Sequence, residues 1–321
     1  QEGRDGGKNP PNDWQSVFGG KAWEKDERTG QYYYHMFTTQ QPDLNWRNPE
    51  VYAEMMNVFR YWADRGVDGF RLDVFNQYFK DAKFRDNPSK FGLRPFDRQV
   101  HLYDTNQPEM IQAVADIRAI LDGYPERYVV GETFLADSKL TASYCGPGKF
   151  HAAFDFALLK STWKPDRFLD AVLRQEKELS SEAWPNHVLN NHDNRRSATR
   201  FRARDDDEKL KVAAAMLLTL RGTPFLYYGE EIGMRDVHVS RSEIQDPVGK
   251  RYWPIPVGRD GCRSPMQWTA ERHSGFSTVA PWLKVHPGYP NRNVEAQSKE
   301  NRSLLNFYKS LLRLRRSHNA L

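Results

Sequence analysis

Apolar residues recur at helical spacing after residue 48, and short apolar runs stand between the helical stretches. Asn48 is a good N-cap and Pro49 suits the first position of a helix. A glycine, Gly66, ends this predicted helix. The apolar positions inside it are three or four residues apart and predict one buried stripe: Val51, Met55, Val58 and Trp62.

Further helices and strands follow in alternation. A second helix opens at Pro108, a third near the acidic run 205–207 and continues through Leu220, and a last one spans 303–317. The second helix has an apolar face, which comprises Ile111, Val114, Ile117 and Leu121. Five apolar segments predict strands: 67–74, 128–133, 150–156, 187–191 and 225–228. Residues 230–300 are rich in Gly, Pro and Trp and predict a long loop.

Alternation of strands with helices predicts an α/β fold with a parallel sheet covered by helices. A closed (β/α)8 barrel needs eight strands. Either three strands lie before residue 1, or the sheet is open and doubly wound. Residues 1–48 have no sustained period, with short strands predicted around 31–36, and form a loop-rich region separate from 49–321.

Composition narrows the class of protein. The chain has 321 residues, 13% aromatic residues and a formal charge of +5, with basic and acidic residues interspersed. This predicts a folded protein with no nucleic-acid partner. No apolar run approaches the roughly 20 residues of a membrane span, so we expect no membrane partner. Cys145 and Cys262 lack metal-ligand spacing and predict free thiols, which favours a cytoplasmic location and no metal site.

The segment 66–74 carries the first candidate for chemistry. Side chains alternate faces along a strand, so Arg71 and Asp73 share the face opposite Phe70, Leu72 and Val74. Active sites of barrels are built at the C-terminal ends of parallel strands. A neighbouring guanidinium favours the ionised form of a carboxylate, which a nucleophile needs. A structural ion pair is the alternative.

Two more strands run into acidic residues. Glu132 follows an apolar run and Gly131, and apolar surroundings favour the protonated carboxyl that a general acid needs. An ordinary strand–loop junction explains it equally well. His192 and Asp193 end the next such segment, as a hydrogen-bonding pair at a binding site or, less favoured, a metal pair. Together the segments predict three carboxylates at the ends of parallel strands, and paired carboxylates are the groups that carry out glycoside hydrolysis.

These three segments resemble signature regions of the α-amylase family, glycoside hydrolase family 13. Residues 41–46 (QPDLNW) resemble a further signature of its oligo-1,6-glucosidase and α-glucosidase subgroup, and three more segments point the same way: 12–20, 227–234 and 258–268. The resemblance implies a (β/α)8 TIM barrel that is incomplete in this chain, with about strands 4 to 8 present. Residues 1–48 resemble the end of the subdomain inserted before them.

The resemblance also implies a role for each candidate residue. Asp73 would be the nucleophile, Glu132 the acid/base and Asp193 the stabiliser of the transition state. Arg71 would orient Asp73, and His192 would bind sugar hydroxyls. Val74 resembles the choice of members that cleave α-1,6 links, although an ordinary core valine explains it equally. The implied reaction is retaining hydrolysis of α-1,6 or α-1,4 glucosidic bonds in small oligosaccharides.

The chain also departs from the family pattern. The first three barrel strands, an Asn-His region that contributes to the first sugar subsite, and the C-terminal β-sandwich are absent from it, and it begins with Gln1 rather than Met. We therefore expect that the rest of a parent chain completes the barrel and that this piece alone is unstable or inactive. No cofactor is expected, and a structural calcium is left open.

Two other functions fit the same family. One is a transglycosylase or sugar isomerase of the trehalose synthase or sucrose isomerase type, which would use the same covalent intermediate. The other is a non-catalytic relative that partners amino-acid transporters, but such relatives lose catalytic carboxylates and carry a membrane span.

Overall fold

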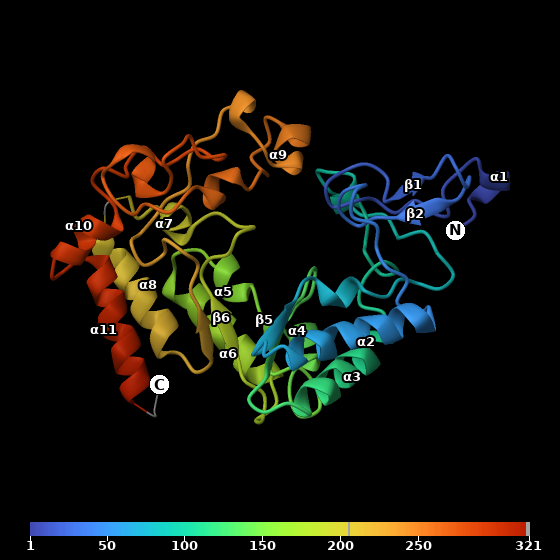
Figure 1. Cartoon of the computed structure of the whole chain (residues 1–321), viewed down its shortest axis with the longest axis horizontal. Helices are drawn as coiled ribbons and strands as arrows, with labels where there is room; N and C mark the ends of the chain where they lie inside the picture. Colours follow the sequence, from blue (N-terminus) through green and yellow to red (C-terminus); the bar gives the residue numbers. More distant parts are fainter. Residues whose placement is uncertain (205, 319–321) are drawn as a thin grey trace. The chain divides into compact units, whose positions relative to one another are not determined.

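The computed structural model describes residues 1–204 and 206–318, so Asp205 of the predicted acidic run and residues 319–321 lie outside the described residues. The chain forms two compact units. The first unit comprises Gln1–Ala153 and Ser180–Ala183, and the second comprises Phe154–Leu179 and Trp184–Leu321. Figure 1 shows the elements of both units in chain order.

The first unit opens with a short helix, α1 (Arg4–Gly7), and a two-stranded antiparallel ribbon. Strands β1 (Trp23–Lys25) and β2 (Tyr32–Tyr34) form that ribbon, which confirms the short strand predicted around 31–36. Aromatic rings make its core, with Trp14 fully buried and edge-on to the ring of Tyr34 at 5.5 Å. The predicted domain boundary at residue 48 stays a prediction.

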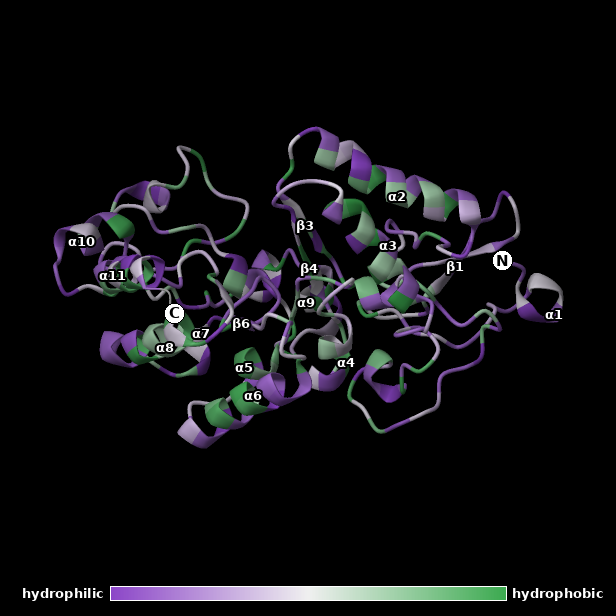
Figure 2. Ribbon diagram, turned by 90° about the horizontal axis from the view of Figure 1, so that it is seen from below, coloured by the Kyte–Doolittle hydropathy of each residue, from purple (hydrophilic) through white to green (hydrophobic). Residues whose placement is uncertain are grey.

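Helix α2 (Pro49–Asp64) begins as predicted, because the side chain of Asn48 accepts from the backbone N–H of Glu50. The predicted stripe is wrong at Val58 and Trp62, which are 42% and 47% exposed, whereas Met55 is partly buried against the core. The buried residues lie one position further along the chain, at Met56, Phe59 and Ala63. Figure 2 shows hydrophobic residues interspersed with hydrophilic ones along α2, so spacing alone did not select the face that packs on the sheet.

Strands β3 (Gly69–Leu72) and β4 (Tyr128–Glu132) pair in parallel, with Leu72 opposite Gly131. The strands approach so closely that a Cβ on Gly69 would lie 2.0 Å from the carbonyl oxygen of Tyr128. Strand β5 (Ala152–Phe154) extends the sheet in the order β3-β4-β5. Strand β3 ends at Leu72, so the alternation of side chains between the two faces ends there. The prediction that Val74 shares a face with Leu72 is therefore wrong.

Helix α3 (Met110–Asp122) packs with α2 beside β3 and β4 (Figure 1). Val114, Ile117 and Leu121 are buried as predicted, whereas Ile111 is 44% exposed, which corrects that part of the predicted face. Met110 lies in the core in its place, because it is four positions before Val114 and seven before Ile117 and so shares their face of the helix. The helix begins at Met110 and not at Pro108.

The second unit has a parallel strand pair, β6 (Asn186–Val188) and β7 (Thr223–Phe225). Helices α8 (Asp207–Thr219) and α11 (Leu304–Ser317) lie side by side and share an apolar cluster (Figure 1). A strand overlaps each of the five segments predicted after residue 48, and three of them, β3, β4 and β5, lie inside the predicted ranges. Strand β6 begins one residue before the predicted 187–191, and β7 shares only Phe225 with the predicted 225–228. Helix α6 (Pro165–Glu178) was not predicted.

The region 230–300 is mostly irregular, as predicted, but two short helices interrupt the predicted long loop, α9 (Pro247–Tyr252) and α10 (Val294–Lys299). Other short elements complete the described chain. They are the helices α4 (Ser138–Ser143), α5 (Ala157–Lys160) and α7 (Ser197–Arg200), and the 3₁₀ turns Phe75–Gln77, Phe96–Arg98, Arg241–Glu243, Asp260–Arg263 and Arg272–Gly275.

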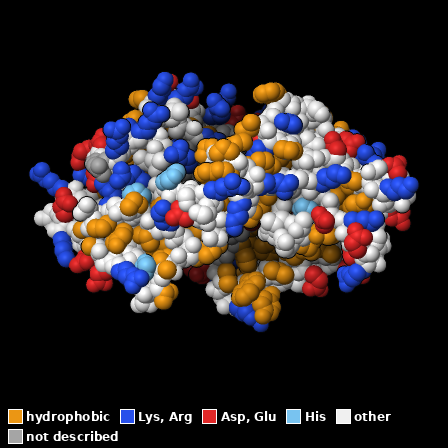
Figure 3. All heavy atoms as spheres, turned by 90° about the horizontal axis from the view of Figure 1, so that it is seen from above, with side chains coloured by type: hydrophobic (Ala, Val, Ile, Leu, Met, Phe, Trp, Pro, Cys, Tyr) orange, Lys and Arg blue, Asp and Glu red, His pale blue; other side chains and the backbone are white. Residues whose placement is uncertain are grey.

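The surface and the thiols agree with the composition. On the face shown in Figure 3, Lys and Arg lie among Asp and Glu, neutral and hydrophobic side chains. Cys145 and Cys262 are free and buried. Among the described helices, none combines the length and the apolar character that crossing a bilayer requires.

Candidate active site

Arg71 joins two carboxylates at the ends of neighbouring strands of the first unit. Asp73 follows β3 directly, and Glu132 is the last residue of β4. Arg71 Nη1 donates to Asp73 Oδ1 at 2.6 Å, and Arg71 Nη2 donates to Glu132 Oε2. The expected ion pair between Arg71 and Asp73 is present. The same guanidinium also contacts Glu132, which the strand pattern did not predict.

The two carboxyl groups have different surroundings. The side chain of Asp73 is 66% exposed, whereas that of Glu132 is 8% exposed. Burial penalises the charged form of a carboxyl, and a guanidinium favours it. Glu132 is therefore both buried and paired with a guanidinium. Asp73 is open to an incoming reactant.

Two aromatic rings support the backbone behind Asp73. Trp46 stacks on Tyr78 with ring centroids 4.5 Å apart. Burial, and then the charge of Asp73, raise the pKa of Tyr78 above its ordinary value, so it remains a neutral phenol. Trp46 ends the 41–46 motif, and Asp43 in the same motif pairs with Lys80 at 2.5 Å. The motif therefore holds the chain that follows β3.

Close packing also fixes the residues that flank both carboxylates. A Cβ on Gly131 would lie 2.3 Å from the ring of Phe75 and 3.0 Å from that of Phe150. Only glycine lets Phe75, which is fully buried, pack against the end of β4. Val74 has a φ of 37°, in the left-handed region that β-branched residues seldom adopt. It is partly buried.

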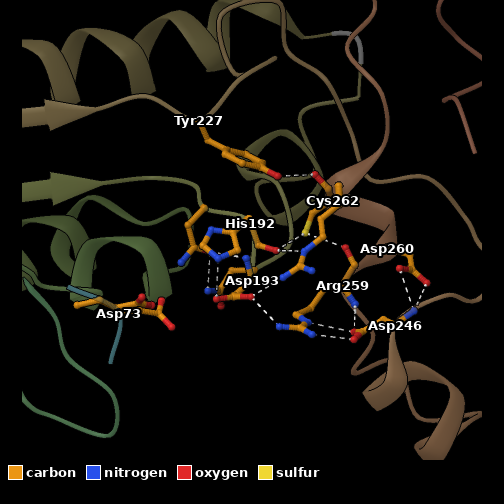
Figure 4. A network of polar contacts seen from close by, with 12 residues as sticks. Asp73, His192, Asp193, Tyr227, Asp246, Arg259, Asp260 and Cys262 are labelled. Carbon is orange, nitrogen blue, oxygen red and sulfur yellow. Dashed lines mark hydrogen bonds and ion pairs between the residues drawn. The ribbon is translucent and has the colours of Figure 1, made fainter. Parts of the chain in front are cut away.

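In the second unit, the chain that leaves β6 carries His192 and Asp193. Asp193 Oδ1 accepts from Arg259 Nη1 at 3.0 Å and from Arg263 Nη2 at 2.8 Å. Asp193 Oδ2 lies 3.3 Å from His192 Nε2 (Figure 4). The predicted neighbours His192 and Asp193 thus contact each other, and two arginines from the 258–268 segment converge on the carboxylate.

The guanidinium group of each arginine also binds a second partner besides Asp193. Arg263 Nε donates to the carbonyl oxygen of His192 at 2.7 Å, and Arg259 pairs with Asp246 (Figure 4). The arginines lie in a segment that the sequence marked as a family signature, but no periodic pattern predicted their contact with Asp193. Tyr227 also binds this segment, because its hydroxyl donates to the carbonyl oxygen of Cys262 at 3.1 Å.

The carboxyl of Glu230 is buried below this network. Desolvation, only partly offset by hydrogen bonds from Asn190 and Tyr308, raises the pKa of Glu230 to about 7. Tyr308 Oη donates to Glu230 Oε1 at 3.0 Å, and Asn190 Nδ2 donates to Oε2 at 2.5 Å. Glu230 is therefore a titratable group built into the core of the second unit.

The chemistry available is that of carboxylates, arginines and one histidine. Within residues 1–204 and 206–318, no three His, Cys, Asp or Glu side chains are grouped to hold a metal ion. The first unit offers an exposed carboxylate beside a buried one, and the second a carboxylate fixed by two guanidinium groups. Such pairs of carboxyl groups with unlike environments suit general acid and nucleophilic roles.

Known proteins that resemble this chain include glycoside-cleaving enzymes, in agreement with the carboxylates described above. The family model described as the α-amylase catalytic domain matches residues 1–321. A probable α-glucosidase of Rhizobium meliloti is 37% identical over 97% of this chain and 59% of its own length. An oligo-1,6-glucosidase of Parageobacillus thermoglucosidasius is 33% identical over 97% of this chain and 61% of its own length.

Solved structures agree as well. The α-glucosyl transfer enzyme XgtA superimposes with a TM-score of 0.94 and 37% identity, over 100% of this chain and 62% of XgtA. An isomaltulose synthase mutant from Erwinia rhapontici in complex with sucrose has a TM-score of 0.86 and 28% identity, over 99% of this chain and 62% of that one. The chain spans about 60% of the length of these relatives. It belongs to the α-amylase family of catalytic domains, whose fold is the (β/α)8 barrel.

Proposed function

We propose that the full-length protein is a retaining α-glucosidase that hydrolyses α-1,6 or α-1,4 glucosidic bonds of short oligosaccharides. Asp73 is the nucleophile, Glu132 the acid/base and Asp193 the stabiliser of the transition state. Relatives described as α-glucosidases and oligo-1,6-glucosidases, 33–37% identical, support the reaction class.

The bridge that Arg71 makes between Asp73 and Glu132 is the observation that carries the proposal. Retaining glycosidases keep their two carboxyl groups about 5–5.5 Å apart, too close for a water molecule to attack between them. Arg71 binds one oxygen of each carboxyl group with the two terminal nitrogens of a single guanidinium, so Asp73 and Glu132 lie close to each other. The pair therefore favours direct attack by a carboxylate over attack by water.

The reaction proceeds in two displacements. Asp73 attacks the anomeric carbon as the bond to the leaving oxygen breaks, and Glu132 donates its proton to that oxygen. Glu132, now ionised, takes a proton from water, which attacks the anomeric carbon and releases Asp73. Arg71 orients the Asp73 carboxylate before the first step and binds the charge left on Glu132 after it.

Asp193 and His192 bind the sugar in this proposal. The carboxylate of Asp193 is fixed by Arg259 and Arg263 and remains one-third exposed, so it can accept sugar hydroxyls. Its fixed negative charge favours the oxocarbenium-like transition state over the neutral substrate. His192, 46% exposed, has the capacity to hydrogen-bond a sugar hydroxyl while it remains against Asp193.

The test uses the full-length protein with isomaltose and maltose. Wild type should release glucose, and NMR should show that the first product is the α-anomer. Asp73→Ala should abolish turnover. Asp68→Ala is the matched control, because Asp68 precedes the same strand and its side chain is 97% exposed. Turnover that survives Asp73→Ala, or a β-anomer as first product, would contradict the proposal.

Transfer of the glucosyl group to a sugar is the second candidate. It is favoured by the similarity to an α-glucosyl transfer enzyme, XgtA, with a TM-score of 0.94, and to an isomaltulose synthase. The same covalent intermediate serves both outcomes, and the acceptor decides between them. Product analysis with maltose, isomaltose and sucrose separates the two, since a hydrolase releases glucose whereas a transferase yields new disaccharides.

Val74 enters the proposal as a specificity residue beside the leaving group. It follows Asp73 directly and is held in an unusual backbone conformation, so its side chain has few alternative positions. Val74→Thr should lower the ratio of isomaltose to maltose hydrolysis. An unchanged ratio with unchanged turnover would leave Val74 as a packing residue only.

A further inference from the structure

We propose that Asp246 is a positioning residue for Asp193 and that it acts through Arg259. The inference rests on the proposed role of Asp193 in stabilising a glucosyl transition state. Asp246 lies 53 positions after Asp193 in the sequence, directly before helix α9, and no pattern in the sequence connects the two residues.

The contacts of Arg259 are divided between two carboxylates. Arg259 Nε and Nη2 donate to Asp246 Oδ2 and Oδ1 at 3.1 Å and 2.8 Å, and Nη1 donates to Asp193 Oδ1 at 3.0 Å (Figure 4). A paired, parallel contact of this kind fixes the plane of the guanidinium. The direction in which Nη1 donates is therefore fixed by Asp246.

Asp246 is itself fixed. Its side chain is 1% exposed, and its Oδ2 also accepts from the backbone N–H of Arg259 at 2.8 Å. Its own backbone N–H donates to Asp260. Burial alone would raise the pKa of Asp246, but hydrogen bonds from Arg259 hold it below its ordinary value, so the carboxylate stays charged.

The other arginine on Asp193 has a different kind of anchor. Arg263 Nε donates to the carbonyl oxygen of His192, the residue next to Asp193. That anchor moves with Asp193 itself. Asp246, in contrast, ties an Asp193 partner to a charged group outside the 192–193 segment. Without it, Arg259 keeps its charge but loses the restraint on its direction, and the stabilising effect of a pre-oriented site is reduced.

A purely structural role is the competing explanation, because the same contacts close the base of the segment 247–258. The backbone of Gly249 approaches that of Gly258 so closely that a Cβ on Gly249 would lie 3.2 Å from the Cα of Gly258. Asp260 contributes to the same base by accepting from the backbone N–H groups of Gln245 and Asp246, whereas the guanidinium of Arg259 binds Asp246 and Asp193. Asp260→Asn is therefore the matched control.

The experiment compares Asp246→Asn and Asp260→Asn in the full-length protein. Turnover of 4-nitrophenyl α-glucoside and of isomaltose is measured, together with Tm and the affinity for the cationic glucose analogue deoxynojirimycin. We expect Asp246→Asn to lower kcat by about 10- to 100-fold with KM changed less than about threefold, and to weaken analogue binding by about tenfold. Asp260→Asn should leave kcat within about threefold.

A double variant tests whether Asp246 acts through Arg259. In an Arg259→Met background, Asp246→Asn should lower kcat no further, since the relay is already broken. Equal kcat losses in Asp246→Asn and Asp260→Asn, or additive losses in the double variant, would overturn the inference. Wild type that binds the analogue without hydrolysing any α-glucoside would contradict the proposed function alone, and wild type that does neither would contradict both.

Discussion

Asn76 makes two opposed hydrogen bonds to the backbone of Phe134. Its Nδ2 donates to the carbonyl oxygen of Phe134 at 2.7 Å, and its Oδ1 accepts from the amide nitrogen of Phe134 at 2.9 Å. The side chain thus imitates a strand and continues the pairing of β3 with β4 beyond the point where both strands end. It joins the segment that follows Asp73 to the segment that follows Glu132.

Asn76→Ala should destabilise the protein and loosen the Asp73–Glu132 pair. Asn76 is 1% exposed, so the change leaves the backbone N–H and C=O of Phe134 without their partner. We expect the free energy of unfolding to fall by about 1–3 kcal/mol. Thermal unfolding should show a lower Tm, and kcat should fall with it. Asn57→Ala on the exposed side of α2 is the control and should change neither. Equal Tm values for the two variants would show that the two bonds to Phe134 do not stabilise the fold.

Gly131→Ala should destabilise the first unit. The new methyl group would meet the rings of Phe75 and Phe150, and overpacking of this kind costs about 1–3 kcal/mol. Gly123→Ala is a suitable control because Gly123 has a right-handed helical backbone with only the carbonyl oxygen of Ile120 nearby. Denaturant unfolding should show a lower midpoint for Gly131→Ala alone, and matching midpoints would contradict the packing argument.

Arg71→Lys should reduce turnover much more than stability. A lysine ammonium carries the charge but cannot bind Asp73 and Glu132 with two nitrogens held in one plane. We expect kcat to fall on the order of 100-fold, with Tm within a few degrees of wild type because the side chain is 38% exposed. Arg60→Lys on the surface of α2 serves as the control. Near-normal kcat in Arg71→Lys would mean that charge alone suffices.

Glu230 should make stability fall as the pH rises. Its folded-state pKa of about 7 exceeds the ordinary value of 4.5, because the carboxyl is desolvated, so the folded protein holds a proton that the unfolded chain has lost between these pH values. The stabilisation is complete below about pH 4.5 and is lost by about pH 7, a difference of about 3 kcal/mol.

Glu230→Gln tests this. The variant should lose less stability than wild type between pH 5 and pH 8 in denaturant unfolding. Gln is neutral throughout and retains a group able to bond Tyr308. Glu271→Gln, at an exposed position, should behave like wild type. A pH profile of Glu230→Gln that overlays the wild-type profile would assign the slope to other groups.

The sequence predicted best which acidic residues stand where β3 and β4 leave the sheet. An apolar run that passes directly into polar residues marks the place where a buried strand leaves the sheet, and it identified Asp73 and Glu132 at such places. Alternation also predicted that Arg71 lies beside Asp73. The parallel pairing of β3 with β4 then accounts for the second contact of Arg71, with Glu132, which requires two strands rather than one.

Two features of the structure could not be predicted from the spacing of apolar residues. Helix α6 buries Phe168, Ala171 and Gln175 and exposes Leu169 and Leu173, so its sequence gives a mixed signal. The contact of Arg259 with Asp193 joins residues 66 positions apart through a segment without periodicity. Such contacts depend on how irregular segments close, and side-chain spacing carries no information about that.

In the segment 247–258, the residues at the closed base must stay the same, whereas the residues at the tip can vary. Asp246 and Arg259 meet where the segment begins and ends, while Trp253 near its middle is 42% exposed. Lengthening such a tip adds loop entropy only slowly. Insertions and substitutions around Trp253 can therefore accumulate in evolution or be introduced in the laboratory. The Asp246–Arg259 pair at the base of the segment stays the same while the tip is exchanged.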